Sequence, residues 1–505
     1  MKRLSTILII ALVAMVALQA IAQDAAPQAG GTLRAAWDAE WTGLDPHIVS
    51  TVSSARILDN VVEPLTAYDD SMRLGPMLAE SWVQSEDGLT WTFTLRQDVT
   101  FSNGRAMTAE DVKWSMDRII DPATGSGRVA QVGGADAVWT VIDDYTVSVT
   151  TSTPNAILPN LLAASTQAVV AHESVGENGQ IVVPIGTGPF IIGDVQGTTN
   201  MTLVKNPNYW QEGLPHLDEV NITVISEDAP REAALVGGEV DWLLFLAPQS
   251  VESLEASADI TVDSVPGLNY FYIGINTLRE PLDDVLVRQA IAYAIDRQQL
   301  CDAGWFGLCT PVQGPTGPSS PWYFDYAPYT QDLDMARSLL EQAGYPDGFE
   351  MELLPTSSYP DSVRQAQVLQ QQLAAVGITT TINAPEWAEW LELEGSGNYD
   401  GYICSWNGLT DANDYYYLQH RTGEVFNFTG YSNPDFDALV DEGRSLSDFD
   451  ERYAVYEQAN KILVDEAPYI YFYNNSITRA YKSYVQGYVT RPDGANFWLN
   501  TWLDQ

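Results

Sequence analysis

The sequence predicts an α/β protein with at least two lobes. Strand and helix patterns alternate along most of the chain, which is typical of this class. The chain has 505 residues. Since one hydrophobic core rarely serves a chain of that length, we expect it to divide. Hydrophobic residues make up 45% of the composition, which is enough to build such cores.

The N-terminus has the pattern of an export signal. Lys2 and Arg3 precede an apolar run over residues 4–18, and Ala20-Ile21-Ala22 forms a small-x-small cleavage pattern. The run is shorter than the roughly 20 residues of a membrane-spanning helix. We therefore predict a signal peptide over residues 1–22 and a soluble periplasmic or secreted protein after cleavage near Ala22; an uncleaved anchor is the alternative.

A strand, a turn and a helix are predicted between residues 79 and 120. The side chains of Trp91, Phe93 and Leu95 alternate with threonines, which indicates a strand with one buried face. Asn103-Gly104 then favours a turn. Thr108 has the position of a helix N-cap, and acidic residues in the first turn favour the helix further.

The residue order in this stretch resembles a known signature. The runs SW, DGLTWTFTLR, VTFSNG and TAEDVKWS are similar to those of extracellular solute-binding protein family 5, the peptide- and nickel-type (cluster C) substrate-binding proteins of ABC importers. Residues 184–190 (PIGTGPF), 203–210 (LVKNPNYW) and 220–242 resemble further landmarks in the expected order. The resemblance covers residue 30 to about residue 473.

This resemblance implies a two-lobed periplasmic binding protein type II fold with an extra subdomain in lobe I. Lobe I is expected over residues 23–268, with the subdomain at about 51–183, and lobe II over 269–479. Residues 480–505 return to lobe I. Within lobe II the patterns predict a crossing strand at 269–276, a helix capped by Asn433, a helix over 449–466 and a strand at 469–473.

The charge balance is strongly acidic. The chain has 67 acidic and 24 basic residues, with a formal net charge of −43. Nucleic acids and anionic membrane surfaces are therefore excluded as partners. The acidic residues are dispersed, so the composition favours a solvated surface suited to a salty or exposed compartment; electrostatic capture of a cation is the alternative.

Two of the three cysteines are candidates for a local disulfide. Cys301 and Cys309 lie eight residues apart around a Gly-rich segment, so an oxidising compartment could join them. Spacing alone does not establish the required geometry. Cys404 is left over, and the four histidines show no pattern that indicates a catalytic thiol.

The resemblance implies a receptor that holds a ligand between closing lobes and presents it to the permease of an ABC importer. A peptide is the leading ligand, an oligosaccharide is the rival, and a nickel chelate is a third alternative. We expect a monomer with no cofactor and no metal. An enzyme, such as a secreted glycoside hydrolase, is the competing class, but the chain has no GxSxG, HExxH or GxxxxGK[ST] motif. We therefore expect no catalysis.

The best candidate contact segment is residues 405–417. In peptide-binding relatives, a tryptophan here is followed by an aspartate that pairs with the ligand's ammonium group. Trp406 matches, but Leu409 stands where that aspartate would be, which argues against ammonium binding in the usual register; Asp411 or Asp414 could substitute from a shifted position. The loop over residues 355–360 also lacks the arginine that dipeptide receptors offer to a carboxylate.

Aromatic and polar side chains complete the predicted site. Aromatic rings stack on apolar ligand faces and on sugar rings, and the chain has 15 tryptophans and 25 tyrosines. Core packing is the competing interpretation for each, and for Tyr270 the alternative is packing at the hinge. The predicted ligand-binding residues are Trp41, Tyr270, Trp387, Trp406, Asn407, Asp411 and Asn427.

Overall fold

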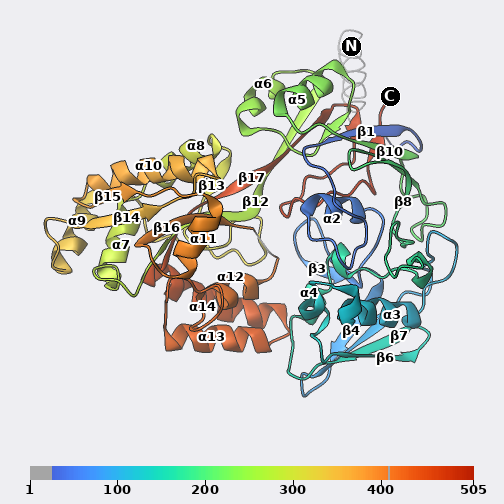
Figure 1. The fold of residues 1–505 in the computed structure, drawn as a ribbon, viewed down its shortest axis with the longest axis horizontal. Helices are drawn as coiled ribbons and strands as arrows, with labels where there is room; N and C mark the ends of the chain where they lie inside the picture. Colours follow the sequence, from blue (N-terminus) through green and yellow to red (C-terminus); the bar gives the residue numbers. More distant parts are fainter. Residues whose placement is uncertain (1–25, 408–409) are drawn as a thin grey trace, which may run out of the picture.

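The computed structural model describes residues 26–407 and 410–505 and has two lobes joined by two long strands (Figure 1). The predicted α/β class and two-lobed architecture are confirmed. The predicted signal peptide and Leu409 lie outside the described residues. Within the described part of the chain, no helix is long and apolar enough to cross a membrane.

One sheet runs through both lobes, and across the described residues it has eleven strands. Ten of them follow the order β15 (Thr379–Ile382), β14 (Glu350–Leu354), β16 (Gly401–Trp406), β12 (Ile260–Ile275), β17 (Tyr469–Lys482), β11 (Trp242–Leu243), β1 (Thr32–Trp37), β10 (Glu219–Val224), β9 (Asn200–Lys205) and β8 (Phe190–Gln196). The short strand β13 (Cys309–Pro311) pairs with β17 off this path.

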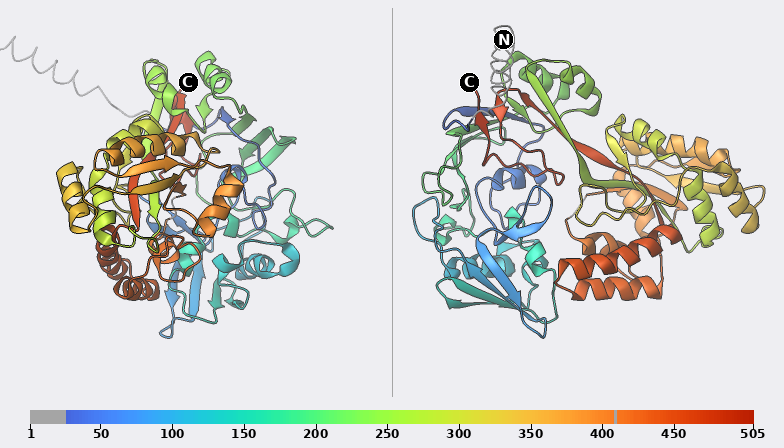
Figure 2. Two further views of the ribbon diagram at one scale, coloured as in Figure 1. Left: turned by 60° about the vertical axis from the view of Figure 1, so that its left-hand side comes forward. Right: turned by 180° about the vertical axis from the view of Figure 1, so that it is seen from behind.

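Strands β12 and β17 form an antiparallel ladder that passes from one lobe to the other (Figures 1 and 2). Beyond Pro266 the register shifts, and pairing resumes at Tyr270. Residues 267–269 therefore bulge out of the ladder. The bulge separates the part of β17 that pairs with β11 in lobe I from the part of β12 that pairs with β16 in lobe II.

Helices cover the lobe II end of this sheet. They are α7 (Val285–Ala294), α8 (Arg297–Trp305), α9 (Leu333–Gln342), α10 (Pro360–Ala374), α11 (Trp387–Gly395), α12 (Ala412–His420), α13 (Pro434–Ser445) and α14 (Phe449–Glu466). The Asn433 side chain accepts from the backbone N–H groups of Asp435 and Phe436, at 2.8 and 3.2 Å, which confirms the predicted cap.

Lobe I holds shorter elements. Its helices and turns of 3₁₀ helix are α2 (Val52–Leu58), α3 (Ala109–Ile120), η1 (Pro122–Thr124), η2 (Val129–Val132), α4 (Leu158–Leu161), η3 (Ser165–Gln167), η4 (His172–Ser174), α5 (Asp228–Gly237), η5 (Pro248–Ser250) and α6 (Val251–Glu255). Two small sheets pair β2 (Thr66–Tyr68) with β3 (Leu74–Pro76) and β18 (Val485–Gln486) with β19 (Trp502–Leu503).

A separate sheet in lobe I has its own hydrophobic core. Its strands lie in the order β4 (Ala79–Gln84), β5 (Thr90–Leu95), β7 (Thr146–Thr150) and β6 (Val138–Asp143). Trp91, Phe93 and Leu95 are at most 4% exposed and pack with Val112 and Met116 of α3. The predicted strand with one buried face and the predicted helix after it are both confirmed.

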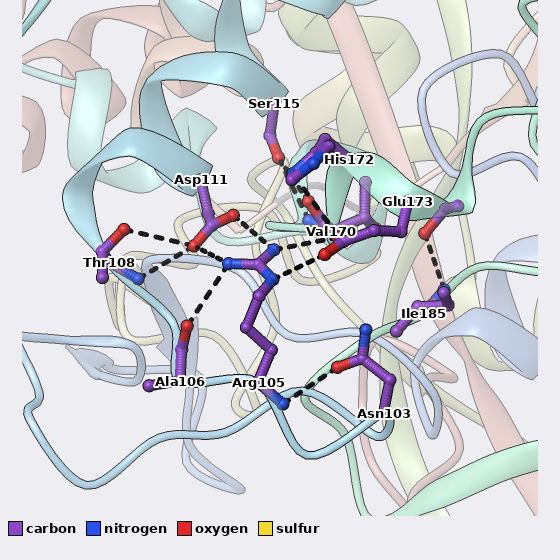
Figure 3. Close-up of polar contacts among 11 residues, drawn as sticks. Asn103, Arg105, Ala106, Thr108, Asp111, Ser115, Val170, His172, Glu173 and Ile185 are labelled. Carbon is purple, nitrogen blue, oxygen red and sulfur yellow. Dashed lines mark hydrogen bonds and ion pairs between the residues drawn. The ribbon is translucent and has the colours of Figure 1, made fainter.

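Arg105 ties this subdomain together (Figure 3). Its guanidinium donates to both carboxylate oxygens of Asp111, at 2.9 and 2.7 Å, and to those of Glu173, at 2.8 and 3.1 Å. Asp111 also accepts from the backbone N–H of Thr108 at 2.9 Å, which fixes the start of α3. The polar residues of the signature stretch thus serve the fold.

A disulfide closes the loop after α8. It joins Cys301 to Cys309, whose Cα atoms lie 6.0 Å apart, so the middle of α8 is linked to the start of β13. Cys404 of β16 is a free thiol of intermediate exposure.

Candidate functional site

A cavity of about 480 Å³ lies between the two lobes and is the candidate ligand site. Segments of lobe I form most of its wall, and Thr410 and Asp414 contribute from lobe II. Two other hollows, of about 350 and 440 Å³, are each lined by residues of a single lobe. Only the first can expose one ligand to both lobes at once, because its lining comes from both.

The wall of this interlobe cavity is largely apolar. Two of its side chains, Val52 and Phe497, are 59% and 37% exposed, which is high for large apolar residues. Accessible apolar side chains that line a cavity are suited to contact a ligand. The other apolar lining residues are Val49, Ala55, Val62, Pro64, Ala67, Met77, Leu161, Ala163, Ala164, Pro189, Ala495 and Leu499.

The lobes already touch beside the cavity. The Tyr68 hydroxyl accepts from Asn160 Nδ2 at 3.0 Å within lobe I, and a hydrogen bond with the Thr410 side chain links it to lobe II. A second contact places the Arg73 guanidinium over the ring of Phe449, 5.0 Å from its centroid. These contacts hold α12 and α14 near the cavity wall.

Glu63 is a buried carboxyl group at the edge of the cavity. It accepts from Thr187 Oγ1 at 2.7 Å, from Tyr209 OH at 3.0 Å and from Trp210 Nε1 at 2.9 Å. Burial raises its pKa to about 7, although these three hydrogen bonds act in the opposite direction. Two of the sequence landmarks, residues 184–190 and 203–210, therefore converge on one carboxyl group that they hold in place.

Gly186 and Gly188 meet a steric need beside Glu63. A Cβ on Gly186 would lie 2.1 Å from the carbonyl oxygen of Val61, and one on Gly188 would lie 2.6 Å from its carbonyl carbon. Residues with side chains would clash with this backbone.

Asp59 and Asp414 face the cavity from opposite lobes. Burial raises the pKa of each to about 7; for Asp414 the charge of Asp411 acts in the same direction, and for Asp59 the charge of Asp493 does. A positively charged ligand group would reverse these shifts, because an opposite charge favours the ionised carboxylate.

Asp411, three residues before Asp414, is already paired. Its carboxylate accepts two hydrogen bonds from the Arg452 guanidinium, at 2.7 and 2.8 Å, and the two side chains are 3% and 5% exposed. It also accepts from the backbone N–H of Asn413 at 2.9 Å, which caps α12. This carboxylate positions α12 within lobe II.

The structure places the predicted aromatic residues away from the cavity lining. Trp41 is 3% exposed in the core of lobe I, and Tyr270 is fully buried with its hydroxyl bonded to Gln419. Trp387 stacks on Trp390 with ring centroids 4.8 Å apart. Trp406, at the end of β16, is half-buried and makes an edge contact with Phe426 at 5.2 Å.

The remaining predicted polar residues differ in exposure. Asn407 is exposed at the end of β16. Asn427 donates from Nδ2 to the carbonyl oxygens of Arg421 and Tyr431, at 3.0 and 2.8 Å, so its amide stabilises the loop before α13. The structure brings neither of them into the described lining of the interlobe cavity.

Several lining residues escaped the sequence prediction. Arg128, Gln131 and Asn160 come from the subdomain, and Arg491 comes from the C-terminal return. They lie in no motif, and more than 300 residues of chain separate the first from the last. No local sequence pattern distinguishes them from polar surface residues.

Comparisons with known proteins agree on one family. The model of the bacterial extracellular solute-binding proteins, family 5, matches residues 73–427. Among curated proteins, the glutathione-binding protein GsiB of Salmonella typhi is 29% identical over 465 residues, which cover 90% of this chain and 91% of that protein.

Solved structures agree with this. HbpA2 from Haemophilus parasuis is 26% identical with a TM-score of 0.87, covering 94% of this chain and 100% of that one. The periplasmic binding protein DppA from Helicobacter pylori, in complex with the peptide STSA, is 27% identical with a TM-score of 0.73, covering 95% and 99%.

Proposed function

Because the chain belongs to the bacterial extracellular solute-binding proteins of family 5, we propose that it captures a peptide-type solute between its lobes and delivers it to the permease of an ABC importer. The observation that carries this proposal is the interlobe cavity, with a lining shared by both lobes. A ligand that contacts both lobes binds the closed arrangement more tightly than the open one and so favours closure. The permease then recognises the closed arrangement.

The names of the relatives support a peptide-type ligand. GsiB is named for glutathione, and the DppA structure holds a tetrapeptide. Such ligands carry an ammonium group, and Asp414 is the lining carboxyl group that lobe II offers to it. Asp411 is less suited to this role, because its carboxylate is paired with Arg452.

Of the residues predicted from the sequence, Trp406 and Asn407 are proposed ligand contacts. Both lie at the end of β16, a few residues before Thr410 and Asp414 of the lining. The measured packing of Trp41, Tyr270 and Trp387 favours roles in the hydrophobic cores instead.

The cellular setting follows from the same proposal. The protein is released to the periplasm or secreted after cleavage near Ala22 and acts as a monomer without catalysis. Two features support the predicted lobe boundaries: the bulge at residues 267–269 and the pairing of Ala480 and Tyr481 with β11. We place the division between lobes I and II at 268/269 and the return to lobe I from residue 480.

Thermal unfolding of the mature protein with candidate ligands tests this function. A ligand that binds only the folded chain raises the midpoint temperature by mass action. We expect shifts with reduced glutathione or with di- to pentapeptides, and a smaller shift in Trp406→Ala. That variant should bind roughly 2- to 13-fold more weakly, since one aromatic contact contributes about 0.5–1.5 kcal/mol.

The same panel includes cello-, xylo- and manno-oligosaccharides and nickel with and without chelators. A shift with a sugar and none with any peptide or glutathione would replace the peptide by an oligosaccharide. Turnover of a glycoside or peptide by the pure protein would contradict the receptor function. Within residues 26–407 and 410–505, no group of three or more His, Cys, Asp or Glu side chains could hold a metal ion.

A further inference from the structure

Arg128 stands out among the charged residues of the interlobe cavity. It is half-buried, directly precedes η2 and lines the cavity. Among the described residues its guanidinium has no ion pair and no hydrogen bond; the hydrogen bonds of this residue come from its backbone, to Ser126 Oγ and from Gln131 N–H. The guanidinium is therefore available to a ligand.

The contrast with the second arginine of the lining sharpens this point. Arg491 donates to Asp70 at 3.0 Å and to Asp493 at 2.8 Å, so its charge is already compensated. The chain has 67 acidic residues for 24 basic ones, and carboxylate partners are abundant. An arginine left without one in a partly buried position of such a protein indicates a site that a ligand completes.

Gln131 provides a second, independent sign at the same place. It lies three residues after Arg128 in η2 and also lines the cavity. Its Oε1 atom is buried and has no hydrogen-bond partner among the described residues. Buried amide oxygens are nearly always hydrogen-bonded, so this acceptor is suited to a donor such as an N–H group of the ligand.

We propose that Arg128 binds a carboxylate of the ligand from the lobe I side of the cavity, while Gln131 Oε1 accepts a hydrogen bond from an N–H group of the same ligand. This inference rests on the proposed receptor function and specifies its ligand class, a solute with a free carboxylate. A guanidinium presents parallel N–H donors that match the two oxygens of a carboxylate. In a peptide the carboxylate would then lie against the subdomain and the ammonium group toward Asp414.

A carboxylate fits this wall better than a phosphate does. A phosphate monoester carries between one and two negative charges more than a neutral group, whereas Arg128 compensates only one. Asp59 and Glu63 line the same cavity and would repel the excess. Burial raises the pKa of both to about 7, so each carboxyl group is partly protonated near neutral pH and repels an anionic ligand less than a full charge would.

Calorimetric titration of the mature full-length chain tests the inference. The probes are the tetrapeptide STSA, the same peptide with a C-terminal amide, and reduced glutathione. Wild type should prefer the acid to the amide. Arg128→Gln should bind the acid roughly 10- to 100-fold more weakly and lose the preference, since a hydrogen-bonded charge contributes about that factor. Arg128→Lys should lose less.

Arg337→Gln is the matched control. It makes the same charge change on the surface of lobe II, where Arg337 is 51% exposed and pairs with Asp334, so its affinities should equal those of wild type. Apo thermal midpoints of all variants verify folding. If Arg128→Gln kept the wild-type ratio of affinities for the acid and amide forms of the peptide, the inference would be overturned.

The failure of the peptide proposal has a different signature. If wild type binds neither the peptides nor glutathione, citrate and succinate become the probes. Binding of either one that is lost in Arg128→Gln supports the carboxylate site without a peptide ligand. No binding of any carboxylate probe overturns the inference.

Discussion

The subdomain core and the interlobe cavity use polar residues in opposite ways. The Arg105 guanidinium donates to two carboxylates, and one of them, Asp111, also accepts from the backbone N–H at the start of α3. Arg128, only 23 residues further along the same subdomain, has no such partners among the described residues. The paired groups around Arg105 stabilise the fold, whereas the unpaired guanidinium of Arg128 lines the interlobe cavity and can bind a ligand.

The largest expected effect tests a paired group that lies next to the cavity. Asp411→Ala should lower the free energy of unfolding of the affected unit by about 3–5 kcal/mol, because the charge of Arg452 would remain buried without a carboxylate partner. Chemical denaturation measures this loss. The double variant Asp411→Leu with Arg452→Met should recover the part due to the unpaired charge but not the α12 cap, since both charges are removed together.

The opposite result would make Asp411 a ligand-binding group instead of a structural one. If Asp411→Ala kept its stability but lost ligand affinity, then this carboxylate would contact the ligand as the sequence predicts. The rule that ion-paired groups serve only the fold would then be wrong for the buried pair of Asp411 and Arg452.

A smaller loss of stability is expected in the signature region. Arg105→Ala removes charge-assisted hydrogen bonds to Asp111 and Glu173, but the arginine is 32% exposed, so water replaces part of them. We expect the free energy of unfolding, measured with denaturant, to fall by about 1–3 kcal/mol, and we expect no change in ligand affinity. A change in affinity with unaltered stability would contradict the purely structural role.

The smallest effect concerns pH and the lobe II side of the cavity. The pKa of Asp414 is raised to about 7 in the folded chain from an ordinary value of 3.8. Between about pH 4 and 7 the folded chain thus holds a proton that the unfolded chain has released, so stability falls as pH rises. In Asp414→Asn the free energy of unfolding should fall less steeply as pH rises. Part of the decrease should remain, because Asp59 and Glu63 contribute in the same direction.

Ligand binding supplies a separate readout for Asp414. An ammonium group favours the ionised carboxylate, so binding near pH 6 should release protons from wild type and fewer from Asp414→Asn. Calorimetric titrations in two buffers with different ionisation enthalpies measure the number of protons released on binding. Equal proton release and equal affinity in both proteins would exclude Asp414 as the ammonium partner.

Local patterns predicted much of the fold. The alternation around Trp91 and the cap at Asn433 depend on residues close in sequence, and both elements form as expected. The long strands were underestimated: β12 begins at Ile260 rather than at residue 269, and β17 continues to Lys482. Their outer halves pair across more than 200 residues, and a local pattern does not contain that partner.

The candidate site was harder to predict, for physical reasons. Asp411 looks like a free carboxylate in sequence, and only the fold brings Arg452 to it from 41 residues away. Trp41 has an aromatic ring that could stack on a ligand, but the ring is buried in the hydrophobic core of lobe I. Arg128 carries no signal, because what distinguishes it is the lack of a partner among the described residues. That property belongs to the tertiary structure.

The ladder of β12 and β17 sets the mechanics of the molecule. Backbone hydrogen bonds run along it on both sides of the bulge, so pulling or sliding the lobes apart would break them, whereas twisting the ribbon leaves them intact. Residues 267–269 of β12 have no ladder partner, so a twist there distorts few backbone hydrogen bonds. A rotation of one lobe against the other about the ribbon axis would therefore keep most of the ladder intact.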